Sequence, residues 1–330
     1  MSIHRVALKY LGIAVLGMAV MLLGLPIDSF SADFPTKPIR IISPFAPGGG
    51  TDIMARSMSA VMGKEKILSV PVIVENKPGG SGAVGYDYVA GKQGDPYYLV
   101  TVTTQFFTNP ILKTQKASFK DFTMICQVAF DPNLVLVRAD FPYNTMKELI
   151  EAAKKEPGKF RWGGTGSTGS DRILTLMLEK SSGAKFNFIP FQSGGEVTTA
   201  LLGKHVDLVT NQVNESISQI QAGKFKALAI GGSARSPYLP NLPTLKESGA
   251  DITTGSYRGI AAPAGIPAEA KKALEEAFKK LDASGEWQKN YIEKFQLQRE
   301  FRDGEGFRKL TEEKLSPDYE AMFKAVGVIK

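Results

Sequence analysis

The sequence predicts an α/β fold built around a mostly parallel sheet. Short apolar runs that are typical of buried strands recur between residues 39 and 230, and Gly/Ser/Thr-rich turns and amphipathic segments follow several of them. Four such turns fall at the carboxyl ends of expected strands, at residues 43–52, 103–105, 163–171 and 192–196. Ligands bind outside the carboxyl ends of strands in such sheets, so the turns predict two half-sites that face each other.

Each element follows from its local pattern. Apolar runs bounded by turn residues predict strands at 39–43, 70–75, 97–103, 133–138, 160–162, 186–191, 206–210 and 226–230. Glycine-rich or capping turns predict helices at 52–62, 82–90, 145–155, 170–182 and 194–202. Apolar residues at helical spacing predict a further helix at 267–281, with Pro267 near its first turn, and two more apolar stripes follow before the C-terminus.

The first 32 residues have the pattern of a secretory signal peptide. His4, Arg5 and Lys9 precede an apolar run at 11–25, and small residues at 29–32 suit cleavage. An uncleaved anchor is the alternative, but about 15 apolar residues are short for a spanning helix. The absence of a cysteine near the cleavage region argues against a lipid anchor. We therefore expect an exported, soluble mature protein.

Composition excludes several classes of protein. The 330-residue chain is 43% hydrophobic, which supports one large or two medium domains. Its net charge of +7 comes from scattered lysines rather than an arginine stripe interleaved with aromatic residues, so nucleic acid is not an expected partner. The single cysteine, Cys126, lies in an apolar stretch and is expected to be a small buried residue without a disulfide.

The turn from Pro44 to Asp52 is the best candidate for a binding site. Its glycines, Gly48 to Gly50, leave backbone N–H groups free at the start of a helix, where the helix dipole favours an anion. Thr51 and Asp52 are expected to cap that helix. A plain strand-to-helix connection is the alternative.

The chemical motifs of common enzymes are incomplete. Two stretches, 80–85 and 164–169, match G-x-G-x-x-G, but neither following strand ends in the acidic residue that a dinucleotide site needs. Outside the leader only His205 remains as a histidine, so a Ser-His-acid triad, a zinc site or another metal site is not expected. No cofactor is expected. Amides, hydroxyls and nearby aromatic rings (Phe45, Phe106, Phe107 and Phe191) are typical of a binding protein.

The sequence resembles the Bug receptors, the periplasmic solute-binding components of tripartite tricarboxylate transporters. The matching motifs run in order along nearly the whole mature chain. They are Pro44-Phe45 with Gly48-Gly49, Val74-Glu75-Asn76-Lys77-Pro78-Gly79-Gly80, Leu201-Leu202-Gly203 with Val206-Asp207, Arg235-Ser236, and Ala262-Pro263-Ala264-Gly265 with Pro267. The chain departs from the family pattern at Gly94-Asp95-Pro96-Tyr97 and at Phe191-Gln192, where a Tyr-Lys pair is usual. The second departure removes a hydroxyl and a positive charge near the expected pocket.

The resemblance implies a type II periplasmic-binding-protein fold with a cleft between two lobes. Lobe one would comprise 33–131 and 255–330, and lobe two 132–254. The solute would be a small organic carboxylate, such as a di- or tricarboxylate or an aromatic acid, delivered by a monomeric receptor to a membrane permease. The expected ligand-binding residues are Phe45, Gly48, Gly49, Gly50, Thr51, Asp52, Thr103, Thr104, Gly166, Ser167, Thr168, Ser170, Ser193, Gly194, Gly195 and Arg258.

Each group of these residues has an expected role. The 48–52 turn and the 166–170 turn would hold a carboxylate from opposite sides, mainly through N–H groups and hydroxyls, and Asp52 would be a cap or hold a water. Arg258 would pair with a second carboxylate, or form an ion pair within the protein. Two other functions stay open: a sensor that presents its ligand to a signalling partner, and an exported enzyme that acts on a carboxylate.

Overall fold

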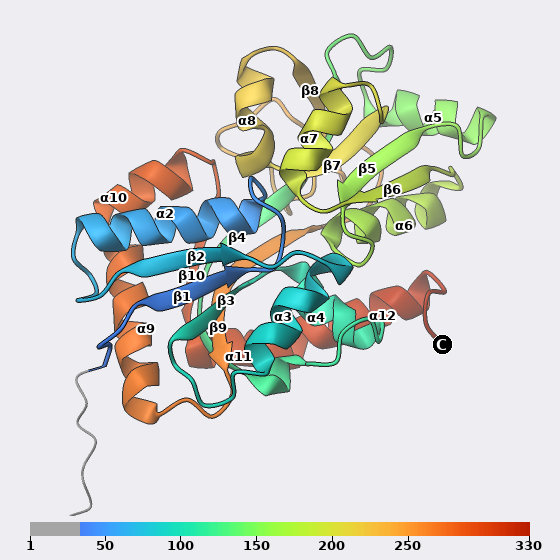
Figure 1. Ribbon diagram of the computed structural model, residues 1–330. Helices are drawn as coiled ribbons and strands as arrows, with labels where there is room; N and C mark the ends of the chain where they lie inside the picture. Colours follow the sequence, from blue (N-terminus) through green and yellow to red (C-terminus); the bar gives the residue numbers. More distant parts are fainter. Residues whose placement is uncertain (1–33) are drawn as a thin grey trace, which may run out of the picture. The chain divides into compact units, whose positions relative to one another are not determined.

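A ten-stranded mixed sheet runs through residues 34–330, the part of the chain that the computed structural model describes (Figure 1). The expected signal peptide at 1–32 lies outside the described residues. Eight strands follow the order β2-β1-β3-β9-β4-β7-β5-β6, and β10 and β8 pair with β4. The strands are β1 (Ile39–Ser43), β2 (Val72–Asn76), β3 (Tyr98–Val102), β4 (Phe122–Arg138), β5 (Arg161–Thr165), β6 (Asn187–Phe191), β7 (Leu208–Gln212), β8 (Phe225–Ile230), β9 (Gly255–Pro263) and β10 (Gln298–Asp303).

Strand β4 is shared by the two halves of the sheet. Its residues 122–132 pair with β9, and residues 133–137 pair with β7. Strands β10 and β8 also pair with its first and second parts, respectively, and all four pairings are antiparallel. The expectation of a mostly parallel sheet is therefore wrong. The pairs β1–β2, β1–β3, β5–β6 and β5–β7 are parallel, whereas every pairing of β4 and β9 is antiparallel.

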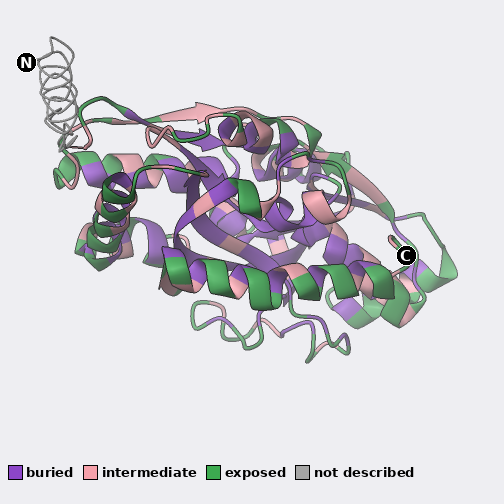
Figure 2. Cartoon of the chain, turned by 90° about the horizontal axis from the view of Figure 1, so that it is seen from below, coloured by how far each residue is buried: buried purple, intermediate pink, exposed green. Residues whose placement is uncertain are grey.

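Helices cover the sheet, and many of them have buried residues on one side and exposed residues on the other, as the alternating colours of Figure 2 show. The helices are α2 (Gly50–Lys64), α3 (Ala83–Ala90), α4 (Thr104–Ile111), α5 (Met146–Lys155), α6 (Ser170–Ser182), α7 (Gly194–Leu202), α8 (Val213–Gln221), α9 (Ala268–Ala283), α10 (Gly285–Trp287), α11 (Gly304–Leu310) and α12 (Ser316–Ala325). Short helical turns lie at η1 (Gly80–Gly82), η2 (Phe119–Asp121), η3 (Gln288–Glu293) and η4 (Thr311–Leu315).

The apolar core is divided along the sheet. One pair of side-chain clusters packs around β1, β3 and β9, and a second pair packs around β5, β7 and β8. In the second half the ring of Trp162 meets that of Phe186 edge to face, with centroids 4.7 Å apart. Cys126 is fully buried in the first half, as expected, and burial raises the pKa of its thiol.

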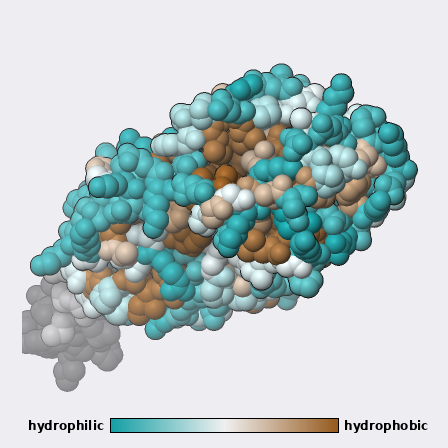
Figure 3. Space-filling model, turned by 90° about the horizontal axis from the view of Figure 1, so that it is seen from above, coloured by the Kyte–Doolittle hydropathy of each residue, from teal (hydrophilic) through white to brown (hydrophobic). Residues whose placement is uncertain are grey.

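The outer surface carries few large apolar side chains. On the face seen in Figure 3 the hydrophobic residues form separate areas bordered by hydrophilic ones. Among residues 34–330, the exposed large hydrophobic residues are Ile73, Val84, Leu202, Tyr238 and Val328. Within residues 34–330, none of the helices combines the length and the apolar character that crossing a bilayer requires.

Candidate functional site

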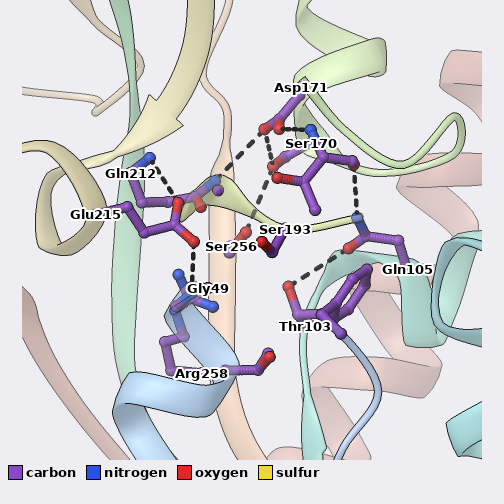
Figure 4. Close-up of a pocket in the computed structure, with 15 residues that line it drawn as sticks. Gly49, Thr103, Gln105, Ser170, Asp171, Ser193, Gln212, Glu215, Ser256 and Arg258 are labelled. Carbon is purple, nitrogen blue, oxygen red and sulfur yellow. Dashed lines mark hydrogen bonds between the residues drawn. The ribbon is translucent and has the colours of Figure 1, made fainter. Parts of the chain in front are cut away.

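Five helices begin around one small pocket. Each of them, α2, α4, α6, α7 and α8, follows a strand and contributes its N-cap residue or a residue of its first turn to the pocket lining. Ser256 and Arg258 of β9, Phe45 after β1, and Thr165 at the end of β5 complete it (Figure 4). The lining residues are Phe45, Gly49, Gly50, Thr51, Thr103, Gln105, Thr165, Ser170, Asp171, Ser193, Gly194, Gln212, Glu215, Ser256 and Arg258.

The pocket is very small. The space open to the centre of a water molecule measures about 20 Å³, which is room for about one water. The backbone N–H of Ala46 donates to the carbonyl of Gln192 at 3.3 Å, so the turns after β1 and β6 are in direct contact. An organic solute therefore fits only after the walls move apart.

The first turn of α2 differs from expectation in how it is capped. Gly49 is the N-cap, without a side-chain hydrogen bond, so the expectation of a cap at Thr51 or Asp52 is wrong. Asp52 instead lies in the first turn, where its carboxylate accepts from the Gly48 N–H at 3.0 Å and from Arg56 at 2.9 Å. Burial acts to raise the pKa of Asp52, but these hydrogen bonds and one from Asn76 outweigh burial, so its pKa is lowered.

A carboxylate of the protein itself occupies part of this turn. The Gly50 N–H donates to the side chain of Glu215, whose other oxygen accepts from the Gln212 N–H at 3.3 Å. Glu215 lies in the first turn of α8, three residues after the N-cap Gln212. Burial raises the pKa of Glu215, and Arg258 and the two N–H donors oppose that rise.

Arg258 forms a buried ion pair rather than a free anion-binding group. Its Nη2 lies 2.7 Å from Asp131 Oδ2, and the two side chains are 2% and 0% exposed. Nε donates to the same oxygen at 3.2 Å, and in the described part of the chain Nη1 makes no hydrogen bond. The guanidinium lies against Gly50, because a Cβ at Gly50 would overlap it. Burial raises the pKa of Asp131 to about 7, and Arg258 opposes this rise.

Asp171 supplies a second carboxylate to the lining. It lies in the first turn of α6, and its Oδ2 accepts from the Thr165 N–H at 2.7 Å. Its Oδ1 has longer contacts, 3.3 Å from the Ser170 hydroxyl and 3.4 Å from Gln212 Nε2. Burial raises the pKa of Asp171 to about 7, although the hydrogen bond from Thr165 opposes it.

The structure brings nine of the sixteen expected ligand-binding residues to the pocket wall. They are Phe45, Gly49, Gly50, Thr51, Thr103, Ser170, Ser193, Gly194 and Arg258. The other seven, which do not line it, are Gly48, Asp52, Thr104, Gly166, Ser167, Thr168 and Gly195. Among these, the Thr104 hydroxyl donates to the Gly255 carbonyl at 3.1 Å. A Cβ at Gly195 would lie 3.3 Å from the Gly48 carbonyl.

The 166–168 turn is engaged in contacts between the two halves of the sheet. The Ser167 N–H donates to Ser81 Oγ at 2.9 Å, and the Thr108 hydroxyl donates to the Thr168 carbonyl at 2.7 Å. Phe106 and Phe107 pack in the core, and Phe191 lies outside the pocket lining. His205 is exposed between α7 and β7.

Six lining residues were not expected from the sequence: Gln105, Thr165, Asp171, Gln212, Glu215 and Ser256. Three of these lie inside turns that were recognised, at 103–105 and 163–171. Gln212 ends β7 and Glu215 lies in the first turn of α8, and no glycine marks the connection between them as a glycine-rich turn. A sequence signal for these two residues exists. The polar pair Asn211-Gln212 follows an apolar run, and Glu215 lies three residues after Gln212. Among residues 34–330 no group of three His, Cys, Asp or Glu residues is arranged to hold a metal ion.

Comparison with known proteins identifies relatives over nearly the full length. Residues 54–327 match the family model described as the tripartite tricarboxylate transporter family receptor. A protein of Cupriavidus necator, named for the gbd 5' region, is 31% identical over 320 residues, which is 97% of this chain and 96% of that protein. The BugT protein of Bordetella pertussis is 27% identical over 258 residues, covering 77% of this chain and 78% of BugT.

Solved structures show the same fold. The periplasmic binding protein BugD has a TM-score of 0.83 at 31% identity, with 89% of this chain and 99% of BugD covered. MatC of Rhodopseudomonas palustris, solved with bound malate, has a TM-score of 0.80 at 24% identity, with 88% of this chain and 99% of MatC covered. The predicted periplasmic-binding-protein fold is therefore confirmed.

Proposed function

Because the chain belongs to the family of tripartite tricarboxylate transporter receptors, we propose that its pocket binds a small organic carboxylate in the periplasm. The observation that carries this proposal is the convergence of five helix N-termini on one pocket, beside Arg258. Each N-terminus carries about half a positive charge and unpaired N–H groups, and both favour an anion.

Capture requires an open form of the protein. We propose that lobe one (33–131 with 255–330) and lobe two (132–254) separate to admit the solute and then close over it. The chain crosses between the two halves within β4 and again before β9, so those crossings are the places for a hinge. The closed, loaded form would be recognised by a membrane permease.

The pocket supports binding rather than turnover. Its lining of amides, hydroxyls, carboxylates and one arginine includes neither histidine nor cysteine, and the arginine is already paired with Asp131. Such a set can fix the position of a carboxylate, but it offers no arranged nucleophile and base. We therefore propose a non-enzymatic role without a cofactor.

A thermal-shift screen of the mature protein tests the proposal. Mono-, di- and tricarboxylic acids and aromatic acids are compared with sugars and with amines that carry no carboxyl group. A solute at 100 times its Kd adds about 2.7 kcal/mol to the free energy of unfolding, which is readily seen as a rise in Tm. Stabilisation only by sugars or simple amines would overturn the proposal.

A substitution at Gly49 tests the location. A Cβ there would lie 3.2 Å from Ser193 Cβ, on the opposite wall of the pocket. Gly49→Leu should therefore prop the walls apart and weaken binding of the carboxylate found in the screen. Unchanged affinity in this variant would place the solute elsewhere.

A further inference from the structure

Helix α6 packs against both halves of the sheet. Leu174 and Leu178 belong to the apolar cluster around β5, which also contains Trp162. Ile173 belongs instead to the cluster around β1, β3 and β9, and Met177 packs against both clusters. The members of each pair are one helical turn apart, so α6 presents two adjacent apolar stripes to two different cores.

Ile173 is the residue of α6 that crosses from one proposed lobe into the core of the other. It is 2% exposed, and among the described residues every other buried member of its cluster belongs to lobe one. These members include Phe107 of α4 and Phe323 of α12. Separation of the two lobes would expose the side chain of Ile173 to water, so its burial favours the closed form.

Lys180 extends the same stripe of α6 to the C-terminal helix. It lies two turns after Ile173, and its ammonium group donates to the backbone carbonyl of Ala325. Ala325 is the last residue of α12, where carbonyl groups lack partners within the helix and the helix dipole favours a cation. Figure 1 shows α12 reaching beneath α6. Lys180 is exposed, so this bond lies at the edge of the contact and salt should screen it.

The other end of α6 lies at the pocket. Ser170 and Asp171, in its first turn, belong to the pocket lining. Lys180 follows Ser170 by about three helical turns, roughly 15 Å at 1.5 Å per residue. A solute that draws the start of this rigid helix toward lobe one therefore also seats Ile173 in the core of lobe one.

We propose that Ile173, Met177 and Lys180 form a closure contact with α12 and the core of lobe one, and that this contact sets solute affinity from outside the pocket. None of the three residues lines the pocket, so they are positioning residues that act by stabilising the closed form. The inference rests on the proposed function, because closure over a solute is part of that function.

Two neighbouring residues of α6 supply a matched test. Ile173→Ala and Leu174→Ala remove the same number of carbon atoms, one from the core of lobe one and the other from the core of lobe two. Affinities of the mature protein for succinate, citrate and benzoate are measured by calorimetry. Ile173→Ala should weaken binding about tenfold, because the lost packing belongs to the closed form. Leu174→Ala should lower the midpoint of urea unfolding but keep affinity within about twofold, because its contacts persist in both forms.

A pair of spin labels measures closure without any solute. Val84→Cys and Leu202→Cys place one label on an exposed site of each proposed lobe, whereas Cys126 is fully buried. Ile173→Ala should shift the distances between the labels toward longer values. Unchanged distances together with unchanged affinity, or equal losses of affinity in both alanine variants, would overturn the inference. If no carboxylate binds, the proposed function fails, and the label distances alone decide whether the closure contact exists.

Lys180→Met tests the polar edge of the contact. Relative to the unmodified protein, it should weaken solute binding about two- to fivefold at low salt, and the loss should shrink as salt is added. Lys180→Arg keeps the charge and should keep the affinity. Lys154→Met, which removes an exposed ion pair with Glu151 within α5, is the control and should have no effect. Unchanged affinity, or a loss that neither salt nor arginine alters, would exclude Lys180 from the closure contact.

Discussion

Gly50 and Glu215, which lie 165 residues apart in the chain, are joined by a hydrogen bond from the Gly50 N–H to the Glu215 carboxylate. The bond connects the first turn of α2 with that of α8, at the two sides of the pocket. The amide that would hold the solute is thus satisfied by the protein when the pocket is closed. The internal carboxylate keeps a buried N–H paired, and a solute carboxylate bound at this amide, as proposed, would have to displace it.

Replacing Gly50 with alanine should lower stability. The new methyl group would overlap the Arg258 guanidinium, which is held in place by Asp131. Overpacking of this kind costs about 1–3 kcal/mol in the free energy of unfolding. Gly63, in the last turn of the same helix, has open space around a Cβ, so Gly63→Ala is the control and should be neutral or stabilising. Urea unfolding of both variants measures the difference, and equal stabilities would contradict the packing argument.

The unliganded protein should lose stability as pH rises from about 5.5 to 7. Burial raises the pKa of Asp171 to about 7, above the value near 3.9 of the unfolded chain. The folded state therefore holds a proton that the unfolded state has released, and the free energy of unfolding falls with pH by about 1–2 kcal/mol across this window. Glu215, Arg258 and Asp131 face the same region. Burial raises the pKa of Asp131 to about 7 as well, so Asp131 adds to the slope, and burial raises the pKa of Glu215 in the same direction.

Two variants show which carboxyl group causes the fall in stability with pH. Asp171→Asn should reduce the slope, because one of the groups that titrate in this window is gone. Asp52→Asn should leave it unchanged, because the pKa of Asp52 is lowered and its titration falls below the window. Stability that stays level or increases from pH 5.5 to 7 in the unmodified protein would refute the assignment.

Removing Arg258 alone should be more damaging than removing the whole ion pair. Arg258→Gln leaves the Asp131 carboxylate buried without a partner, which costs about 3–5 kcal/mol of unfolding free energy. Combining it with Asp131→Asn should restore about half of that loss, since no uncompensated charge remains. Chemical unfolding of the two variants gives the comparison. If Arg258→Gln alone lowers the free energy of unfolding by less than about 1 kcal/mol, the ion pair is not isolated from water.

Ser81→Ala should weaken solute binding with little effect on unfolding. Ser81 Oγ accepts from the Ser167 N–H across the two halves of the sheet, and such a bond contributes about 0.5–1.5 kcal/mol. The expected loss in affinity is about two- to tenfold by calorimetry. Ser59→Ala removes a hydrogen bond to the Val72 carbonyl within one half. If Ser59→Ala weakens binding as much as Ser81→Ala does, the contact across the halves has no special part in closure.

The elements with strong local signals could be predicted from the sequence. The strand at 39–43 and the helix at 170–182 have the predicted bounds, because each has a clear apolar pattern and a marked start. The first eleven residues of β4, and all of β9 and β10, were missed. Their pairings are antiparallel and join residues far apart in the chain, and β10 is largely polar. Such contacts leave no periodic pattern in any single window.

The candidate site could be predicted mainly where Gly/Ser/Thr-rich turns contribute to its lining. Glycine-rich turns led to Gly49, Gly50, Ser193 and Gly194, since glycine is an unmistakable mark of close backbone approach. Asp171 and Glu215 lie where acidic residues commonly stabilise helix starts, so in the sequence they look like ordinary first-turn residues. Only the structure shows that two such turns meet at one pocket.

Strand β4 also determines where the chain can be divided into fragments. Its seventeen residues belong to both halves of the sheet, with residue 132 pairing into one half and residue 133 into the other. A truncation on either side of this strand would deprive one half of its central strand and expose an unsatisfied edge. Neither half is therefore a candidate for expression as an independent fragment. Two-piece reconstitution should instead use a break in a surface turn such as 157–158, which leaves β4 whole.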